Sequence, residues 1–298
     1  MSTTFNPNIL PDLLLDLQTA QQNAENAAEE ISTGRAVNAP GDNPAAVAAL
    51  VLNDAQTSED AQFQTNISDL QSKLQVGNSV MSDAAQLMTS AITLGTEGAT
   101  GTTTASERQS IAQQVAGLQQ QMLALANSTY QGAYIFSGTN VTAPAFTADS
   151  SSSTGVDYNG NSATTSVEIS QGQSIQTNLP GSQVFLNSSG NVFKALNDLT
   201  NALNSGTGIA AAVTEAQNAF TQINGQAGFY GDALSQLQNT ESYLSQETVN
   251  LSSQQNSLIG ANLTQAATNL TQDEIDEQAS ESATAQILQI PTVLDYIE

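Results

Sequence analysis

The sequence predicts a mainly α-helical protein: an elongated helical bundle with a small β-rich insertion domain and terminal helices that form coiled-coil contacts. Three observations predict this class. Apolar residues recur at intervals of three and four over long stretches, including both ends of the chain. A stretch in the middle loses that period and gains Ser, Thr and Gly. Charged residues make up only 11% of the chain, so Gln, Asn, Ser and Thr supply the polar helix faces.

Residues 1–42 are expected to be an N-terminal helical assembly segment. Its coiled-coil stripe consists of Leu10, Leu13, Leu17, Ala20, Ala24, Ala27 and Ile31. Burial of the four large apolar side chains contributes about 6 to 12 kcal/mol, and ordering the backbone of the segment costs more. We therefore predict that this segment is disordered in the free monomer and folds when partners cover it.

Residues 43–142 are expected to form the first part of the helical bundle. Asn43 is a good N-cap residue, and Pro44 suits the first helical position. The helix that follows carries a regular apolar stripe with Gly77 at a point of close helix approach. A second helix is expected to open at Ser106 and to present a seam from Ile111 to Leu125.

Residues 143–186 read as a small β insertion domain. Val167, Ile169, Ile175 and Leu179 suggest short strands, and Asn-Gly and Pro-Gly pairs mark turns between them. The second part of the bundle is expected over residues 187–260, with a helix from about Ala210 to Gly260.

Residues 261–298 are expected to be the C-terminal helical assembly segment. Its stripe is Ile275, Ala279, Ala283, Ile287, Ile290, Leu294 and Ile297. The acidic run from Asp273 to Glu277 is interpreted as an exposed face with Ile275 turned inward. The first and last helices can then pair with each other and leave apolar surface for neighbouring copies.

Composition excludes several functional classes. The chain has 28 acidic residues against four basic ones, a formal net charge of −24, and neither histidine nor cysteine. Four scattered cations cannot form a patch for nucleic acid or for an anionic membrane. Disulfides, thiolate metal sites and histidine chemistry are absent, so we expect no catalytic residue, no metal and no cofactor. No apolar run reaches bilayer length and no cleavable leader is recognisable, so we expect an unconventional route if the chain is exported.

Two acidic patterns offer alternative interpretations. Asp157, Asn159, Asn161 and Glu168 have the spacing of an EF-hand loop, but Ser162 replaces the required Gly and helices do not flank it. A turn between strands explains the same residues. The carboxylates of Asp273 to Glu277 leave open a secreted acidic hydrolase, which would need two opposed carboxylates roughly 5 to 9 Å apart.

Several motifs resemble bacterial flagellins and their hook-associated relatives. The run ISTGRAVNAPGDNPA at residues 31–45 is similar to the turn after the first helix of that family. GAYIFSG at residues 132–138, PAF at 144–146, YNG at 158–160 and TVLDYI at 292–297 resemble the hook-associated protein 3 branch. The resemblance covers nearly the whole chain.

The resemblance implies a non-enzymatic, flagellin-like structural subunit exported by a type III route without a cleaved signal peptide. It implies an extracellular homo-oligomeric ring at the hook–filament junction of the flagellum, next to another hook-associated protein and flagellin. A cytoplasmic export chaperone is a further expected partner. Filament flagellin is the nearest alternative function.

The motif turn is the sharpest expected site outside the stripes. Its members are Gly34, Arg35, Asn38, Asp42 and Pro44. Arg35 is interpreted either as a contact between subunits or within the chain, or as a solvated cation favoured by the helix C-terminus. Asp42 is expected to cap the helix that follows it.

Overall fold

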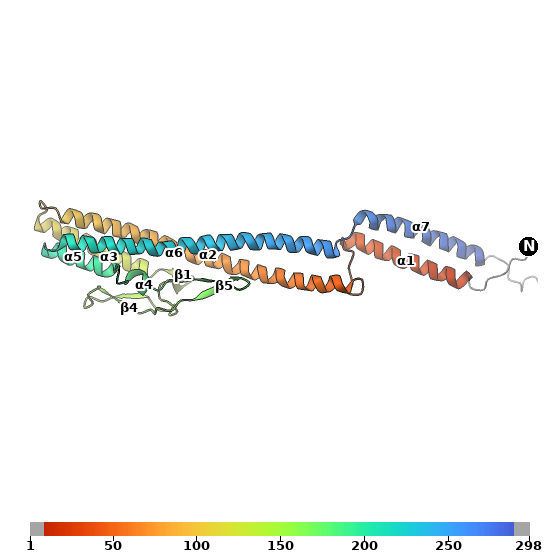
Figure 1. Cartoon of the computed structure of the whole chain (residues 1–298), viewed down its shortest axis with the longest axis horizontal. Coiled ribbons are helices and arrows are strands. Elements are labelled where there is room, and N and C mark those ends of the chain that lie inside the picture. Colours follow the sequence, from red (N-terminus) through yellow and green to blue (C-terminus); the bar gives the residue numbers. More distant parts are fainter. Residues whose placement is uncertain (1–8, 289–298) are drawn as a thin grey trace, which may run out of the picture. The chain divides into compact units, whose positions relative to one another are not determined.

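The computed structural model describes residues 9–288, with side chains from 11 to 286, and confirms the mainly α class. Two compact units are present in it: the described parts of residues 1–58 and 247–298 form one, and residues 59–246 form the other. Helices α2 (Pro44–Gly98) and α6 (Ile209–Ile259) each contribute residues to both units. Figure 1 shows the order of the elements along the chain.

The larger unit is a helical bundle built from parts of α2 and α6 together with α3 (Ala105–Ala126) and α5 (Val192–Ser205). The predicted stripe of α2 forms its core: Phe63, Ile67, Leu70, Leu74, Met81, Ala84, Met88 and Ala91 are all buried. Gly77 on α2 lies directly against the ring of Tyr230 on α6, because a Cβ at this glycine would overlap that ring. A glycine in the stripe therefore permits close helix approach, as predicted.

Helix α3 begins two residues earlier than the sequence suggested. Thr104, and not Ser106, is its N-cap: the Thr104 hydroxyl accepts from the Glu107 backbone N–H at 3.3 Å, and the Glu107 carboxylate accepts from the Thr104 N–H at 2.7 Å. This reciprocal capping box satisfies two backbone donors that a helix start leaves free.

Three two-stranded antiparallel sheets lie in the larger unit. They pair β1 (Thr129–Tyr130) with β2 (Ala133–Tyr134), β3 (Phe146–Ala148) with β4 (Val156–Tyr158), and β5 (Ser166–Ser170) with β6 (Gln173–Gln176). The first hairpin turns through Gln131 and Gly132, both with positive φ. Ile169 and Ile175 turn into the core, so the short strands expected from their alternation are present.

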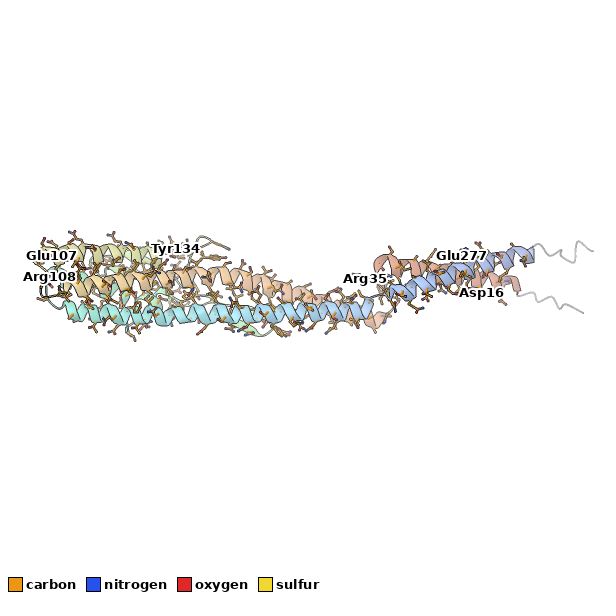
Figure 2. All side chains as sticks on the ribbon, turned by 90° about the horizontal axis from the view of Figure 1, so that it is seen from above. Asp16, Arg35, Glu107, Arg108, Tyr134 and Glu277 are labelled. Carbon is orange, nitrogen blue, oxygen red and sulfur yellow. The ribbon has the colours of Figure 1, made fainter. Side chains whose placement is uncertain are left out.

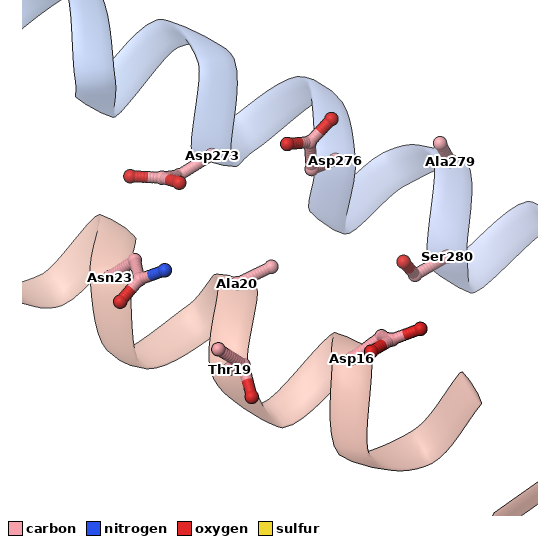
Figure 3. A pocket seen from close by; sticks show the side chains of 8 residues that line it. All are labelled: Asp16, Thr19, Ala20, Asn23, Asp273, Asp276, Ala279 and Ser280. Atoms are coloured by element: carbon pink, nitrogen blue, oxygen red, sulfur yellow. The ribbon is translucent and has the colours of Figure 1, made fainter. Parts of the chain in front are cut away.

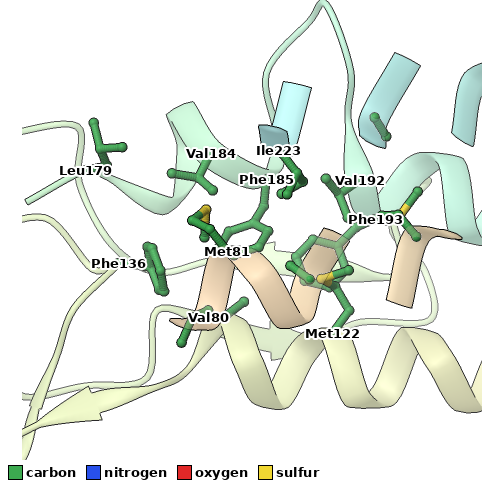
Figure 4. Packing of buried hydrophobic residues seen from close by; sticks show 14 of the residues in the cluster. Val80, Met81, Met122, Phe136, Leu179, Val184, Phe185, Val192, Phe193 and Ile223 are labelled. Carbon is green, nitrogen blue, oxygen red and sulfur yellow. The ribbon is translucent and has the colours of Figure 1, made fainter. Parts of the chain in front are cut away.

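Four phenylalanines pack the β-rich segment onto the bundle. Phe136, Phe146, Phe185 and Phe193 are fully buried. Four pairs of these rings are in contact, with centroids 5.2 to 5.9 Å apart, and Figure 4 shows Phe136, Phe185 and Phe193 among them. Phe185 ends the short helix α4 (Gly181–Phe185), and Phe193 lies at the start of α5. Neither helix was expected from the sequence. Edge-to-face and tilted ring pairs of this kind add to simple area burial.

The smaller unit contains α1 (Ile9–Thr33) and α7 (Leu263–Leu288), which run antiparallel and side by side, together with the first residues of α2 and the last of α6 (Figure 1). Gly34 ends α1 with φ of +69°, a left-handed conformation suited to glycine. The backbone of the next residues pairs with the chain entering α7: the Ala36 N–H donates to the Ile259 carbonyl at 2.7 Å, and the Ala261 N–H donates to the Gly34 carbonyl at 3.0 Å.

Candidate assembly interface

The motif turn is held by its own side chains. The Asp42 Oδ2 accepts from the backbone N–H groups of Ala39 at 2.7 Å and Asn38 at 2.9 Å, and these two bonds lower the pKa of Asp42. Asp42 therefore closes the turn behind it and does not cap α2, contrary to the sequence expectation. Asn43 is the cap, because its Oδ1 accepts from the Ala46 N–H at 3.1 Å and Pro44 follows it as the first helical residue.

Arg35 is exposed, and its guanidinium forms no ion pair with any described residue. The backbone of Arg35 makes two contacts that hold the turn. Its carbonyl accepts from the Asn38 side-chain amide at 2.9 Å, and the residue forms an isolated antiparallel bridge with Gly260. Figure 2 shows Arg35 at the end of α1, on the opposite end of that helix from Asp16. Its side chain is thus free for a contact outside the chain, which stays a prediction.

Five members of the predicted stripe lie on the face of α1 against α7, whereas the sixth described member, Ile31, is exposed, contrary to the expectation. Ala20 and Ala27 are 8% and 6% exposed, and Leu13, Leu17 and Ala24 are half-buried. These five residues follow one another at alternating intervals of four and three, the spacing of a coiled-coil seam. Alanines at the centre of the seam leave room for close helix approach.

The opposing face of α7 is more polar than the sequence suggested. Its seam is Ala266, Leu270, Asp273, Glu277, Ser280 and Thr284, in which Ala266 is 1% exposed and the others are half-buried. The Gln21 side-chain amide on α1 donates to the Glu277 carboxylate at 2.9 Å. We refer to these six residues as the α7 seam.

Ile275 points away from α1. It is 55% exposed and Ala279 is exposed too, so the expectation that Ile275 turns inward and the carboxylates outward is wrong for Asp273 and Glu277. The reason is the register of the helix, because residues two positions from a seam residue lie on the opposite face. The outward row of α7 includes Leu263, Ala267, Thr271 and Ile275 and lines a shallow, largely apolar depression.

Apolar side chains remain exposed on α1 as well. Leu14 is 48%, Leu15 63% and Ile31 37% exposed. Leu14 and Leu15 lie next to each other near the N-terminal end of α1, and Ile31 lies near its other end. The pair of helices therefore buries one seam internally and leaves separate apolar side chains exposed on α1 and an apolar depression on α7.

A shallow groove runs between the two helices near the middle of the pair. Asp16, Thr19, Ala20 and Asn23 line it from α1, and Asp273, Asp276, Ala279 and Ser280 line it from α7 (Figure 3). Among the described side chains, no three acidic, cysteine or histidine residues are grouped so as to hold a metal ion.

The residues of the EF-hand pattern are occupied by structural contacts. The Asn159 side-chain amide donates to the Thr147 hydroxyl at 3.0 Å, and the Asn161 side-chain oxygen Oδ1 accepts from the Thr139 and Ala163 N–H groups. The Glu168 carboxylate accepts from the Gly172 N–H at 2.8 Å. Asn159 and Asn161 lie between β4 and β5, where the turn was expected.

The short motifs at 132–138, 144–146 and 158–160 lie against one another in the β-rich segment. The Tyr158 hydroxyl lies 3.0 Å from the Phe136 carbonyl and 2.8 Å from the Asn161 carbonyl, and the Tyr158 ring packs on Phe146 with centroids 4.9 Å apart. The Asn159 N–H donates to the Ala145 carbonyl at 2.8 Å. The three short motifs at 132–138, 144–146 and 158–160 thus form one packed turn cluster.

Part of the two predicted stripes lies outside the described residues. Ile290, Leu294 and Ile297 lie outside the described residues, and so do the side chains of Leu10 and Ile287. Ala283 is described and half-buried. None of the helices over residues 9–288 combines the length and apolar character that a bilayer crossing requires.

The chain therefore combines a helical bundle bearing a small β-rich segment with a unit in which helices from the two ends of the sequence pair with each other. The chain belongs to the bacterial flagellin family. The model of the bacterial flagellin N-terminal helical region matches residues 12–141, and that of the C-terminal helical region matches residues 213–297.

Relatives within the family are similar in sequence over part of the chain. Flagellar hook-associated protein 3 of Salmonella typhimurium is 30% identical over 159 residues, which cover 53% of this chain and 48% of the relative. The Escherichia coli K12 protein of the same name is 35% identical over 112 residues, or 37% and 35% of the two chains. The matches therefore span half or less of these relatives' length.

Solved structures share the fold at low sequence identity. Bacillus cereus FlgL aligns with a TM-score of 0.60 and 20% identity, covering 69% of this chain and 99% of that one. The flagellar junction protein FlgL from Legionella pneumophila aligns with a TM-score of 0.62 and 14% identity, covering 71% and 100%. The helical bundle with a small β-rich segment is thus a known architecture.

Proposed function

We propose that this chain is a non-enzymatic structural subunit of the bacterial flagellum that forms the hook–filament junction. The observation that supports the proposal most is the antiparallel pair α1 and α7, which buries one seam and leaves Leu14, Leu15 and Ile275 exposed for neighbours. The similarity to hook-associated protein 3 favours the junction over the filament.

The proposed mechanism is folding coupled to docking. Residues 1–42 and 261–298 serve as assembly segments, are disordered in the free chain and pair at the growing end of the structure. Burial of apolar area between copies then replaces a core that each segment lacks alone. Type III export, a ring of identical subunits, an adjoining hook-associated protein and flagellin, and a cytoplasmic chaperone complete the proposal.

Deletion of the gene tests the place of the protein in the flagellum. Electron microscopy of cells without it should show hooks that lack filaments, with flagellin released into the medium. Hooks that still carry filaments would refute the junction role. Elongation of filament seeds by the purified chain would favour the alternative, a filament flagellin.

A charge in the seam tests the assembly mechanism. Leu17→Asp introduces a carboxylate at a half-buried seam position of α1, and Gln18→Asp adds the same charge on the exposed face one residue away. We expect Leu17→Asp to abolish incorporation into flagella while the larger unit keeps its helical circular dichroism signal. Gln18→Asp should incorporate. Equal incorporation of the two variants would contradict the mechanism.

A further inference from the structure

The charge of the α1–α7 pair is entirely negative. Over its described length α1 carries Asp12, Asp16, Glu25, Glu29 and Glu30, and α7 carries Asp273, Glu274, Asp276, Glu277 and Glu281; neither helix contains Lys or Arg. Helices that pair stably often place opposite charges beside the seam. Here each helix approaches a partner of the same sign.

Two of these carboxylates occupy the α7 seam itself. Asp273 and Glu277 lie at successive seam positions and are half-buried against α1, whereas Glu274 and Glu281 on the same helix are exposed. Seam positions normally hold apolar residues, and a polar one lowers the stability of the pair. A carboxylate there also loses part of its hydration without gaining a cation.

The groups that face these two carboxylates from α1 do not neutralise them. Gln21 donates one neutral hydrogen bond to Glu277, and the groove that Asp273 lines also holds Asp16 and Asn23 from α1 and Asp276 from α7. Figure 3 shows Asp16 and Asp273 on the two sides of this groove. Asn23 lies across from Asp273 in this view, so the residue that faces this carboxylate from α1 is a neutral amide.

We infer that Asp273 and Glu277 make the pairing of α1 and α7 conditional on ionic surroundings, so that the two helices stay apart in a free chain at low salt and pair when their charge is screened or covered. The inference deepens the proposed assembly role, because it names what delays pairing until docking. Burial of the apolar seam residues of α1 favours pairing. The charges of Asp273 and Glu277 in the α7 seam oppose it.

Isosteric neutral variants separate this effect from a general change of charge. Asp273→Asn with Glu277→Gln removes both seam charges and keeps side-chain size and an oxygen that can accept from Gln21. Glu274→Gln with Glu281→Gln is the matched control, since it changes the net charge equally on exposed positions of the same helix.

Spin labels can report pairing in the full chain, which has no cysteine of its own. Gln22→Cys on α1 and Gln278→Cys on α7 are exposed positions for the two labels. Distances between them are measured by pulsed electron paramagnetic resonance at 20 and 500 mM NaCl, since screening is far stronger at the higher concentration. The readout is the fraction of molecules with the short distance.

In the labelled chain with Asp273 and Glu277 intact, we expect the ratio of molecules with α1 and α7 paired to molecules with them apart to rise about five- to tenfold over this salt range. The seam variant should show a high ratio already at 20 mM NaCl and a salt response of less than about twofold. The exposed control should retain most of the salt response.

The inference is overturned if the labelled chain with Asp273 and Glu277 intact shows no salt response. It is also overturned if the seam variant and the exposed control show equal salt responses. Neither outcome bears on the junction role, which is judged by gene deletion and by incorporation of Leu17→Asp. Conversely, filaments on hooks lacking the protein would remove the junction role and leave the measured salt response standing.

Discussion

Gly77→Ala should destabilise the larger unit by up to about 2 kcal/mol. An added Cβ would lie 2.7 Å from Cζ and 2.9 Å from Cδ1 of Tyr230, well inside van der Waals contact. Tyr230 is only 3% exposed, so its ring cannot swing into solvent to make room. Overpacking of this kind costs about 1 to 3 kcal/mol, and the better helix propensity of alanine returns about 1 kcal/mol.

Gly225→Ala is the matched control, because Gly225 is also within a long helix and a Cβ there meets nothing within 4 Å. We expect this variant to be stabilised by about 1 kcal/mol. Urea denaturation followed by far-ultraviolet circular dichroism gives the two free energies of unfolding.

A double-mutant cycle tests whether the destabilisation by Gly77→Ala comes from overlap with the Tyr230 ring. In a Tyr230→Leu background, which lacks the aromatic ring, Gly77→Ala should cost little or become favourable. The reasoning is refuted if Gly77→Ala and Gly225→Ala have the same free energy of unfolding. It is also refuted if Gly77→Ala lowers that free energy equally with and without Tyr230→Leu.

Three further perturbations test local features. Thr104→Ala removes the hydroxyl of the capping box and should lower the free energy of unfolding by about 1 kcal/mol in urea titrations; no loss would show that the cap is unimportant. Gln131→Asn should raise it by about 0.5 kcal/mol, because asparagine tolerates the φ of 50° at this turn better than glutamine; a loss of stability would contradict that account. For Asp42, hydrogen bonds lower the folded pKa below the ordinary 3.8, so its contribution is present at neutral pH and is lost as the pH falls through the lowered value. Amide proton exchange at Asn38 and Ala39 should accelerate over that range, and Asp42→Asn should remove the pH dependence; unchanged exchange would sink the assignment.

Features that depend on a few neighbouring residues were predictable from the sequence. Asn43 and Pro44 place the start of α2 correctly because the chemistry of a helix start is local. The stripe of α2 is long and regular enough to identify its buried face, including Gly77. Helix α5 was missed although Phe193, Leu196 and other apolar residues recur at helical spacing there; the helix is short and lies between two glycine-containing turns.

Features that depend on which faces meet in space were not predictable. Thr104 and Ser106 are both plausible caps, and only the geometry of Glu107 selects the first. The α7 helix has no regular apolar stripe, because Ala, Thr and Gln are interspersed with acidic residues. Ile275 was therefore assigned to the face toward α1, and that assignment is wrong. Asp42 could bond forward or backward, and the conformation of the turn selects the backward partners.

The backbone bridge between Arg35 and Gly260 has a consequence for biosynthesis. Its two residues lie far apart in the sequence, so closing the bridge costs chain entropy and must follow synthesis of the chain as far as Gly260. While a ribosome is still translating the middle of the message, α1 has been made but its partner has not. During that interval the nascent N-terminal region lacks the helix against which it packs in the finished protein.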